Sequence, residues 1–207
     1  MAIDLAPLFQ RVYSLLASPA RTWHTIEREP DPGRLMITRY VLLLAIVPAL
    51  CSFLGGWIAG GRFWFSLVLS AIRLAIFVGS VYLLGLAVNA MAPSFGARRD
   101  KDNAFKTAAY ASTPLWVAGV LTIVPILTAL AALLGFGLAV YHFQIGCRFV
   151  METPERKAWA FSCVSVGVWF GMILIAMLIL YPVLVFLFTP MLVFGPIPLP
   201  APATSGA

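Results

Sequence analysis

The chain has 207 residues, of which 61% are hydrophobic and only 11% are charged. A water-soluble domain of this length carries about a quarter charged residues, because polar side chains must cover its surface. The composition therefore excludes an ordinary soluble fold and predicts an all-α membrane protein built as one helical bundle. The net charge of +6 does not indicate nucleic acid binding, because the basic residues lie in short loops without interleaved aromatics.

Residues 1–34 are predicted to form two amphipathic helices ahead of the first apolar run. Ser18 and Pro19 mark the start of the second helix, and Trp23 and Ile26 share its apolar side. We expect the pair to lie in the cytoplasmic membrane interface; docking against the bundle is the structural alternative, and recruitment of a partner is the functional one. The apolar residues of the first helix repeat at steps of three and four: Leu5, Leu8, Phe9, Val12, Leu15 and Leu16.

Residues 35–190 are predicted to form a domain of five transmembrane helices. In lipid, a single segment can satisfy its backbone hydrogen bonds only as a helix. The sequence also lacks the alternation of apolar and polar residues that a transmembrane β-barrel would require. Pro48 and the pair Gly55-Gly56 are expected to bend or loosen the first helix, and Pro182 to kink or end the fifth. The tail, 191–207, is rich in Pro and Ala and is predicted to be extended. The five segments are about 35–58, 65–90, 106–124, 126–147 and 158–188.

The basic residues predict the orientation in an inner, or plasma, membrane. In a five-span arrangement, twelve of the fourteen Lys and Arg residues fall on one side, and Arg62 stands alone on the other. The positive-inside rule then places the N-terminus in the cytoplasm and the C-terminus outside. We also expect these basic segments to attract anionic lipid headgroups. The twelve are Arg11, Arg21, Arg28, Arg34, Arg39, Arg98, Arg99, Lys101, Lys106, Arg148, Arg156 and Lys157.

Arg73 lies well inside an apolar segment, where a charge is costly and indicates function by default. No acidic residue lies in any predicted span to pair with it. If the second helix starts near Ile72, Arg73 reaches the outer headgroups by snorkelling, and the preceding RFWFSLVLSA stretch lies along the membrane surface. The alternative is a buried functional arginine in a polar cavity shared with Tyr82 and Tyr110.

Further polar residues lie near the cytoplasmic end of the fourth helix. His142 is expected to be an interfacial histidine with ordinary hydrogen bonds, and a proton relay is the alternative; Gln144 is a second candidate polar residue. Gly167 and Gly171 form a GxxxG pair, which is a helix-packing signal. No metal-binding, phosphate-binding or triad motif is present, so we predict no cofactor, no metal and no enzymatic activity.

Three segments together resemble the Yip-one domain family, whose eukaryotic members interact with Ypt/Rab GTPases. They are Ser18-Pro19 followed by Trp23 and Ile26, then AFKTAAYASTPLWVAGVLTIVP, then FQIGCRFVMETPERKAW from Phe143 to Trp159. The resemblance extends over residues 10–185 and implies a five-helix bundle with a cytoplasmic N-terminus. We expect no counterpart of the long hydrophilic N-terminal domain of the eukaryotic relatives, so their GTPase partnership is not carried over.

The loop in the third segment also has a purely structural interpretation. Thr153 is expected to cap a helix, with Pro154 in its first turn and Glu155 favouring the helix dipole. Lys157 is the fourth candidate residue of this cytoplasmic loop motif.

Three functions remain open from the sequence. The first is a non-enzymatic protein that acts by assembly or membrane organisation, as a homo-oligomer or with another membrane protein. The second is a permease or channel with a polar site near Arg73, formed by helices broken at prolines. The third is a lipid-directed enzyme that uses His142 and loop residues at the cytoplasmic face.

Overall fold

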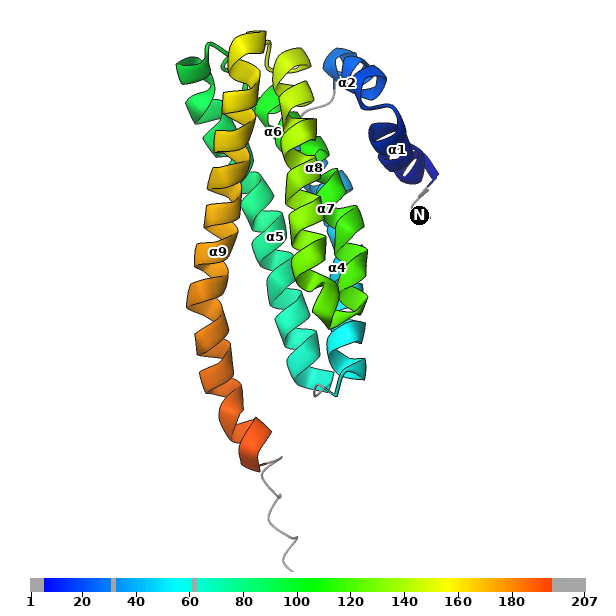
Figure 1. The fold of residues 1–207 in the computed structure, drawn as a ribbon, viewed down its shortest axis with the longest axis vertical. Coiled ribbons are helices and arrows are strands. Elements are labelled where there is room, and N and C mark those ends of the chain that lie inside the picture. Colours follow the sequence, from blue (N-terminus) through cyan, green and yellow to red (C-terminus); the bar gives the residue numbers. More distant parts are fainter. Residues whose placement is uncertain (1–5, 31–32, 61–62, 195–207) are drawn as a thin grey trace, which may run out of the picture.

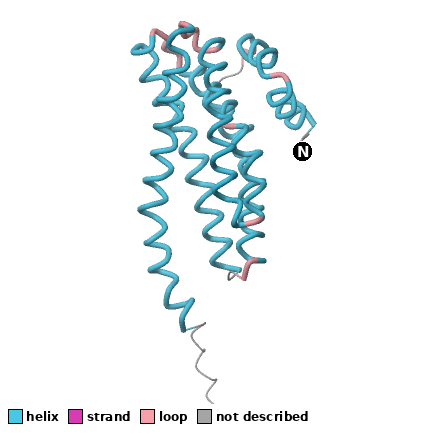
Figure 2. Tube along the Cα trace, in the orientation of Figure 1, coloured by secondary structure: helices cyan, strands magenta, loops and turns pink. Residues whose placement is uncertain are grey.

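In a computed structural model of the protein, residues 6–30, 33–60 and 63–194 are described, apart from the side chains of 34 and 187–194. Every regular element in these ranges is helical, and they contain no strand (Figure 2). The elements are α1 (Ala6–Ala17), α2 (Pro19–Arg28), α3 (Gly33–Met36), η1 (Ile37–Val41), α4 (Leu42–Ile58), α5 (Phe63–Met91), η2 (Ala92–Phe95), α6 (Lys101–Ala111), α7 (Thr113–Ala118), η3 (Gly119–Ile123), η4 (Pro125–Leu127), α8 (Thr128–Phe149) and α9 (Glu155–Phe194).

The long helices form an elongated bundle, with α1 and α2 beside one end and α9 extending past the other (Figure 1). Four helical segments of the described chain are long and apolar enough to cross a membrane: Ile37–Ile58, Phe63–Phe95, Pro125–Phe149 and Glu155–Phe186. A helix needs roughly 20 apolar residues for one crossing, and each of these segments exceeds that length. The predicted helical membrane protein is therefore confirmed, but the count of five spans is not.

The predicted third span, 106–124, is divided. It comprises the second half of α6, then α7 and the tight helical turn η3. The division falls at Ser112, because Pro114 has no backbone N–H to donate and its ring disfavours helix in the residue before it. Pro114 is instead accommodated in the first turn of α7. Each piece alone is too short to span a bilayer.

The last helix is longer than the sequence predicts. α9 begins at Glu155 and continues through Pro182 to Phe194, so Pro182 is not the exit point that we expected. A proline inside a helix removes one hydrogen bond, and long apolar segments tolerate this because the bilayer offers the backbone no better partner. The predicted extended tail is wrong for residues 191–194, which are helical; the rest of it lies outside the described residues.

The end of the bundle next to α1 and α2 holds its most closely packed core. All eight residues from Ala104 to Ala111 in α6 are buried, and α6 packs against α3, α5 and α8. Phe105 fits against Gly85 of α5, where a Cβ atom would lie 2.5 Å from the phenylalanine ring. Small residues on α6 and α5 thus let two helices approach closely around one large ring.

Candidate functional site

The N-terminal helices are held to the bundle by a buried tryptophan. Trp23 of α2 is fully buried, as is Ile26 one turn further on. A Cβ atom at Gly146 of α8 would lie 2.8 Å from the indole ring, so only glycine leaves room for the tryptophan. The Tyr110 ring of α6 meets the indole edge-on, with 6.3 Å between centroids. We call this set, Trp23, Ile26, Tyr110 and Gly146, the tryptophan dock.

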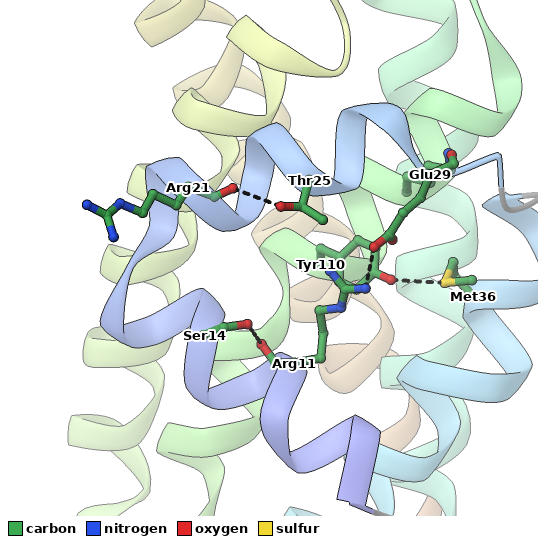
Figure 3. A network of polar contacts seen from close by, with 8 residues as sticks. Arg11, Ser14, Arg21, Thr25, Glu29, Met36 and Tyr110 are labelled. Atoms are coloured by element: carbon green, nitrogen blue, oxygen red, sulfur yellow. Dashed lines mark hydrogen bonds and ion pairs between the residues drawn. The ribbon is translucent and has the colours of Figure 1, made fainter.

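Polar contacts surround the tryptophan dock. The Arg11 guanidinium of α1 forms an ion pair with Glu29, which follows α2, and lies over the Tyr110 ring at 5.7 Å from its centroid (Figure 3). Lys106 of α6 donates a hydrogen bond to the Glu29 carbonyl oxygen. Burial lowers the pKa of Arg11, but the hydrogen bond to Glu29 and the electrostatic interactions with Tyr110, Glu29 and Tyr40 together outweigh it, so the net direction is upward. The charged Arg11 therefore joins α1, α2 and α6.

Tyr110 also faces α3 and η1. Its hydroxyl donates to the Met36 sulfur at 3.4 Å (Figure 3), and its ring lies 4.8 Å from that of Tyr40. Tyr40 in turn shares a 2.8 Å hydrogen bond with the hydroxyl of Thr113. The sequence singled out Tyr110 as part of a cavity, whereas the structure places it in a packed aromatic cluster.

The other predicted polar residues do not gather into one site. Tyr82 on α5 is 40% exposed, and the centroid of its ring lies 5.2 Å from that of Phe105. His142 and Gln144 of α8 are both buried, and His142 Nδ1 has no hydrogen-bond partner among the described residues. This burial differs from the hydrogen-bonded interfacial histidine that we expected.

The loop before α9 also differs from its predicted capping. The Thr153 hydroxyl is buried without a hydrogen-bond partner in the described chain, while its backbone N–H donates to the Cys147 carbonyl at 2.9 Å. The backbone N–H groups of Lys157 and Ala158 donate to the carbonyl of Pro154, so Pro154 precedes the first turn. Thr153 is therefore not a side-chain cap, and Pro154 is the last residue before the helix. The helix begins at Glu155, which forms an ion pair with Arg148 at 3.0 Å.

The second notable feature is a cavity of about 460 Å³ at Arg73, between α4, α5, α7, η3, α8 and α9. α5 is continuous from Phe63, which places Arg73 ten residues, or roughly 15 Å, along the helix. The stretch before Arg73 is therefore part of the same helix and not a separate surface segment. Arg73 is half-buried and lines the cavity instead of lying at the start of its helix.

A smaller cavity of about 310 Å³ adjoins the first. Both are lined by Arg73, Ser52, Thr122 and Thr128, so Arg73 stands where they meet. Among the described residues, Arg73 forms no ion pair and no hydrogen bond; its electrostatic neighbour is Tyr181 of α9. We refer to the two spaces together as the Arg73 cavity.

Tyr82 and Tyr110 do not line the Arg73 cavity, contrary to the expectation of a site shared by these three residues. Sequence reasoning missed the residues that do contribute polar groups to it. Ser66, Ser70 and Arg73 repeat at steps of four and three along α5, which puts them on one helical face. That repeat was the available signal. The described residues contain no cluster of His, Cys, Asp and Glu side chains arranged to hold a metal ion.

The fold and these sites define a polytopic helical membrane protein with two N-terminal helices docked on its bundle. The Yip1 domain model matches residues 13–179, and the chain therefore belongs to the Yip1 domain family. The resemblance that the sequence motifs indicated is thereby confirmed.

Two relatives are similar to the chain over most of its length. Both are described as "Inner membrane protein YohC", one from Escherichia coli strain K12 and one from Escherichia coli O6:H1. Each is 25% identical over 169 residues, which is 76% of this chain and 87% of the relative. No solved structure matches the chain. The names of these relatives state a location in the inner membrane and no activity.

Proposed function

We propose that this protein is a non-enzymatic component of the inner membrane that acts by assembly, first of all with a second copy of itself. The observation that carries the proposal is an outward face on α9 to which nothing in the described chain packs. A Cβ atom added at Gly167 or Gly171 would meet no atom within 4 Å. We call this the assembly face: Cys163, Val164, Gly167, Gly171, Leu174, Ile175 and Leu178.

The geometry of α9 favours helix association at this face. The buried residues of the helix, among them Phe161, Trp169 and Ile173, point towards α5 and α8, on the side opposite to the glycines. Lipid tails are as apolar as leucine, so membrane helices associate chiefly by close van der Waals packing. Two glycines four residues apart allow the backbones of two helices to approach closely, which bulky side chains would prevent.

The proposed orientation places the tryptophan dock in the cytoplasm and the C-terminus outside. It is supported by the distribution of basic residues, which gather in the segments at the α2 end. α6, α7 and η3 lead from the α2 end towards the other end and would make the fifth crossing (Figure 1). Exposed basic residues such as Lys101 and Arg156 would then meet anionic headgroups at the cytoplasmic face.

The permease alternative finds weaker support in the geometry. Most side chains lining the Arg73 cavity are apolar, and neither Tyr82 nor Tyr110 extends it towards the α2 end. The enzyme alternative required His142 to act at the cytoplasmic face, whereas this side chain is buried.

Cys163 offers a direct test, because it is exposed on the assembly face while Cys147 is buried and Cys51 is half-buried. The full-length protein in native membranes is treated with a short bismaleimide cross-linker and analysed by denaturing electrophoresis. A cross-linked dimer is expected, and Cys163→Ser should abolish it. Replacing both Gly167 and Gly171 by Ile should reduce it several-fold, because the added side chains block close packing.

Gly137→Ile is the matched control, since a Cβ atom at Gly137 of α8 also meets nothing within 4 Å. This variant should cross-link as the wild type does. Failure of the wild type to cross-link at Cys163, or equal cross-linking of all variants, would contradict self-assembly through this face. Cross-linking to a different membrane protein would show that the partner is not a second copy.

A further inference from the structure

We propose that the Arg73 cavity binds a membrane phospholipid of net negative charge through its phosphate group, with the guanidinium of Arg73 as the headgroup ligand. This inference is independent of the proposed assembly, because it concerns a space between helices of one chain. Two features carry it: a cation without an acidic partner among the described residues, and a cavity whose walls are mostly apolar.

The charge on Arg73 calls for a compensating anion. A guanidinium inside an apolar helix costs several kcal/mol unless it is paired, hydrated or drawn to the interface. The polar groups that line the cavity with it are the phenol of Tyr181 and the hydroxyls of serines and threonines, and none of the cavity's lining residues is acidic. A phosphate group fits this need, since the planar guanidinium donates two parallel hydrogen bonds to phosphate oxygens.

The neighbouring hydroxyls explain why Arg73 must supply the charge-assisted bonds. Ser52 donates to the Ala49 carbonyl at 3.0 Å and its oxygen lies 3.0 Å from that of Ser70. Thr122 donates to the Gly119 carbonyl at 2.7 Å and Thr128 to the Pro125 carbonyl at 2.7 Å. These hydroxyl groups make the end of the cavity polar, but most of their protons are already used. The five N–H donors of the guanidinium carry no such commitment.

The walls favour a lipid over a free anion. Beyond Arg73, the larger cavity is lined by apolar side chains such as Leu74, Phe77, Phe136, Ile173 and Met177. A small hydrated anion gains nothing from such walls, whereas an acyl chain gains dispersion contacts along them. Tyr181 lines the cavity and is itself 51% exposed, so the cavity reaches the lipid-facing surface at this side chain.

Native mass spectrometry of the full-length protein in detergent tests this directly. Dioleoyl phosphatidylglycerol and dioleoyl phosphatidylcholine are added in separate experiments, so that only the headgroup differs. The wild type should retain one phosphatidylglycerol and clearly less phosphatidylcholine. Arg73→Gln should lower phosphatidylglycerol retention about tenfold or more, because a charge-assisted bidentate contact is lost. Arg73→Lys keeps the charge without the planar fork and should fall in between.

Arg156→Gln is the matched control, because Arg156 is exposed at the start of α9, at the other end of the bundle. It removes the same charge at an exposed site, so it should lower phosphatidylglycerol retention far less than Arg73→Gln does. Thermal unfolding in lipid-free detergent checks that the variant is folded. Under these conditions Arg73→Gln should be at least as stable as the wild type. Equal retention of both lipids by the wild type, or wild-type retention in Arg73→Gln, would overturn the proposal. Displacement of the lipid by millimolar inorganic phosphate would also overturn it and identify a soluble-anion site.

Discussion

The two ends of this bundle are built in opposite ways. At the α2 end, rings fill the space left by glycines and alanines: Trp23 lies against Gly146, and Phe105 against Gly85. At the other end, the helices enclose the Arg73 cavity, and Ile58 and Ile126 are among the most exposed side chains. The α2 end is thus specialised for a single close packing arrangement, whereas the other end retains a cavity that a ligand can occupy.

This comparison indicates where substitutions will affect stability and where they will affect binding. A close-packed region has no space for added atoms and leaves a void when a ring is removed. A hollow region tolerates added atoms and loses little when a side chain is shortened. Four changes, from the largest expected effect to the smallest, test whether the two ends differ in this way.

Trp23→Ala should have the largest effect. It removes a fully buried indole, and such truncations cost about 3–5 kcal/mol in the free energy of unfolding. Since α2 is held mainly by this side chain, limited proteolysis should cut near α1 and α2 before the bundle unfolds. Trp159→Ala is the control, because Trp159 is 52% exposed on α9; it should change stability by no more than about 0.5 kcal/mol. Equal protease resistance of the two variants would contradict the tryptophan dock.

Gly146→Val should have the next largest effect. Its Cβ atom would lie 2.8 Å from the Trp23 ring, and overpacking of this kind costs about 1–3 kcal/mol. Gly137→Val lies on the same helix, where a Cβ atom meets nothing within 4 Å, and should be nearly neutral. Chemical unfolding in detergent measures both. If Gly146→Val left the free energy of unfolding unchanged, α2 would be able to shift away from α8 at no energetic cost.

Alanine-to-leucine substitutions should have opposite signs at the two ends. Ala109 of α6 is fully buried in the packed end, so Ala109→Leu should destabilise by about 1–3 kcal/mol. Ala131 of α8 lines the Arg73 cavity, so Ala131→Leu fills empty space and should stabilise by about 0.5–2 kcal/mol. Thermal unfolding of both variants in lipid-free detergent decides the matter. Destabilisation by both would mean that the cavity is too narrow for a leucine side chain.

The ion pair between Arg11 and Glu29 should have the smallest effect. Both side chains are partly exposed, at 27% and 23%, and such pairs contribute about 1 kcal/mol or less. A double-mutant cycle with Arg11→Gln and Glu29→Gln isolates the pair, and its coupling should shrink as salt is added. A large coupling that does not depend on salt would mean that charge and not the indole holds α1 and α2.

The sequence predicted the helical class, because only uninterrupted apolar runs can cross a bilayer, and run length is read directly. It also contained the break at Pro114, but the hydropathy of the whole segment outweighed that single residue in our interpretation. Contacts between distant residues were not predictable. Nothing local to Trp23 indicates that its space is provided by Gly146, since a glycine in a membrane helix has many uses.

The candidate site was only half predictable for the same reason. Arg73 stands out in any reading of the sequence, because a charge in an apolar run is rare. Its surroundings depend on how seven elements pack, and the tyrosines that we grouped with it lie elsewhere. Only the repeat of Ser66, Ser70 and Arg73 on one face of α5 linked the arginine to its polar neighbours.

The tryptophan dock also has a consequence for biogenesis. Trp23 leaves the ribosome early, whereas the residues against which it packs are made much later: Tyr110 follows α5, and Gly146 lies near the end of α8. The helices α1 and α2 therefore have no protein surface to pack on during most of membrane insertion, and we expect them to rest on the lipid surface or on a chaperone until then. Docking of Trp23 would accordingly be one of the last steps of folding. It would occur only in chains whose α8 has been correctly inserted.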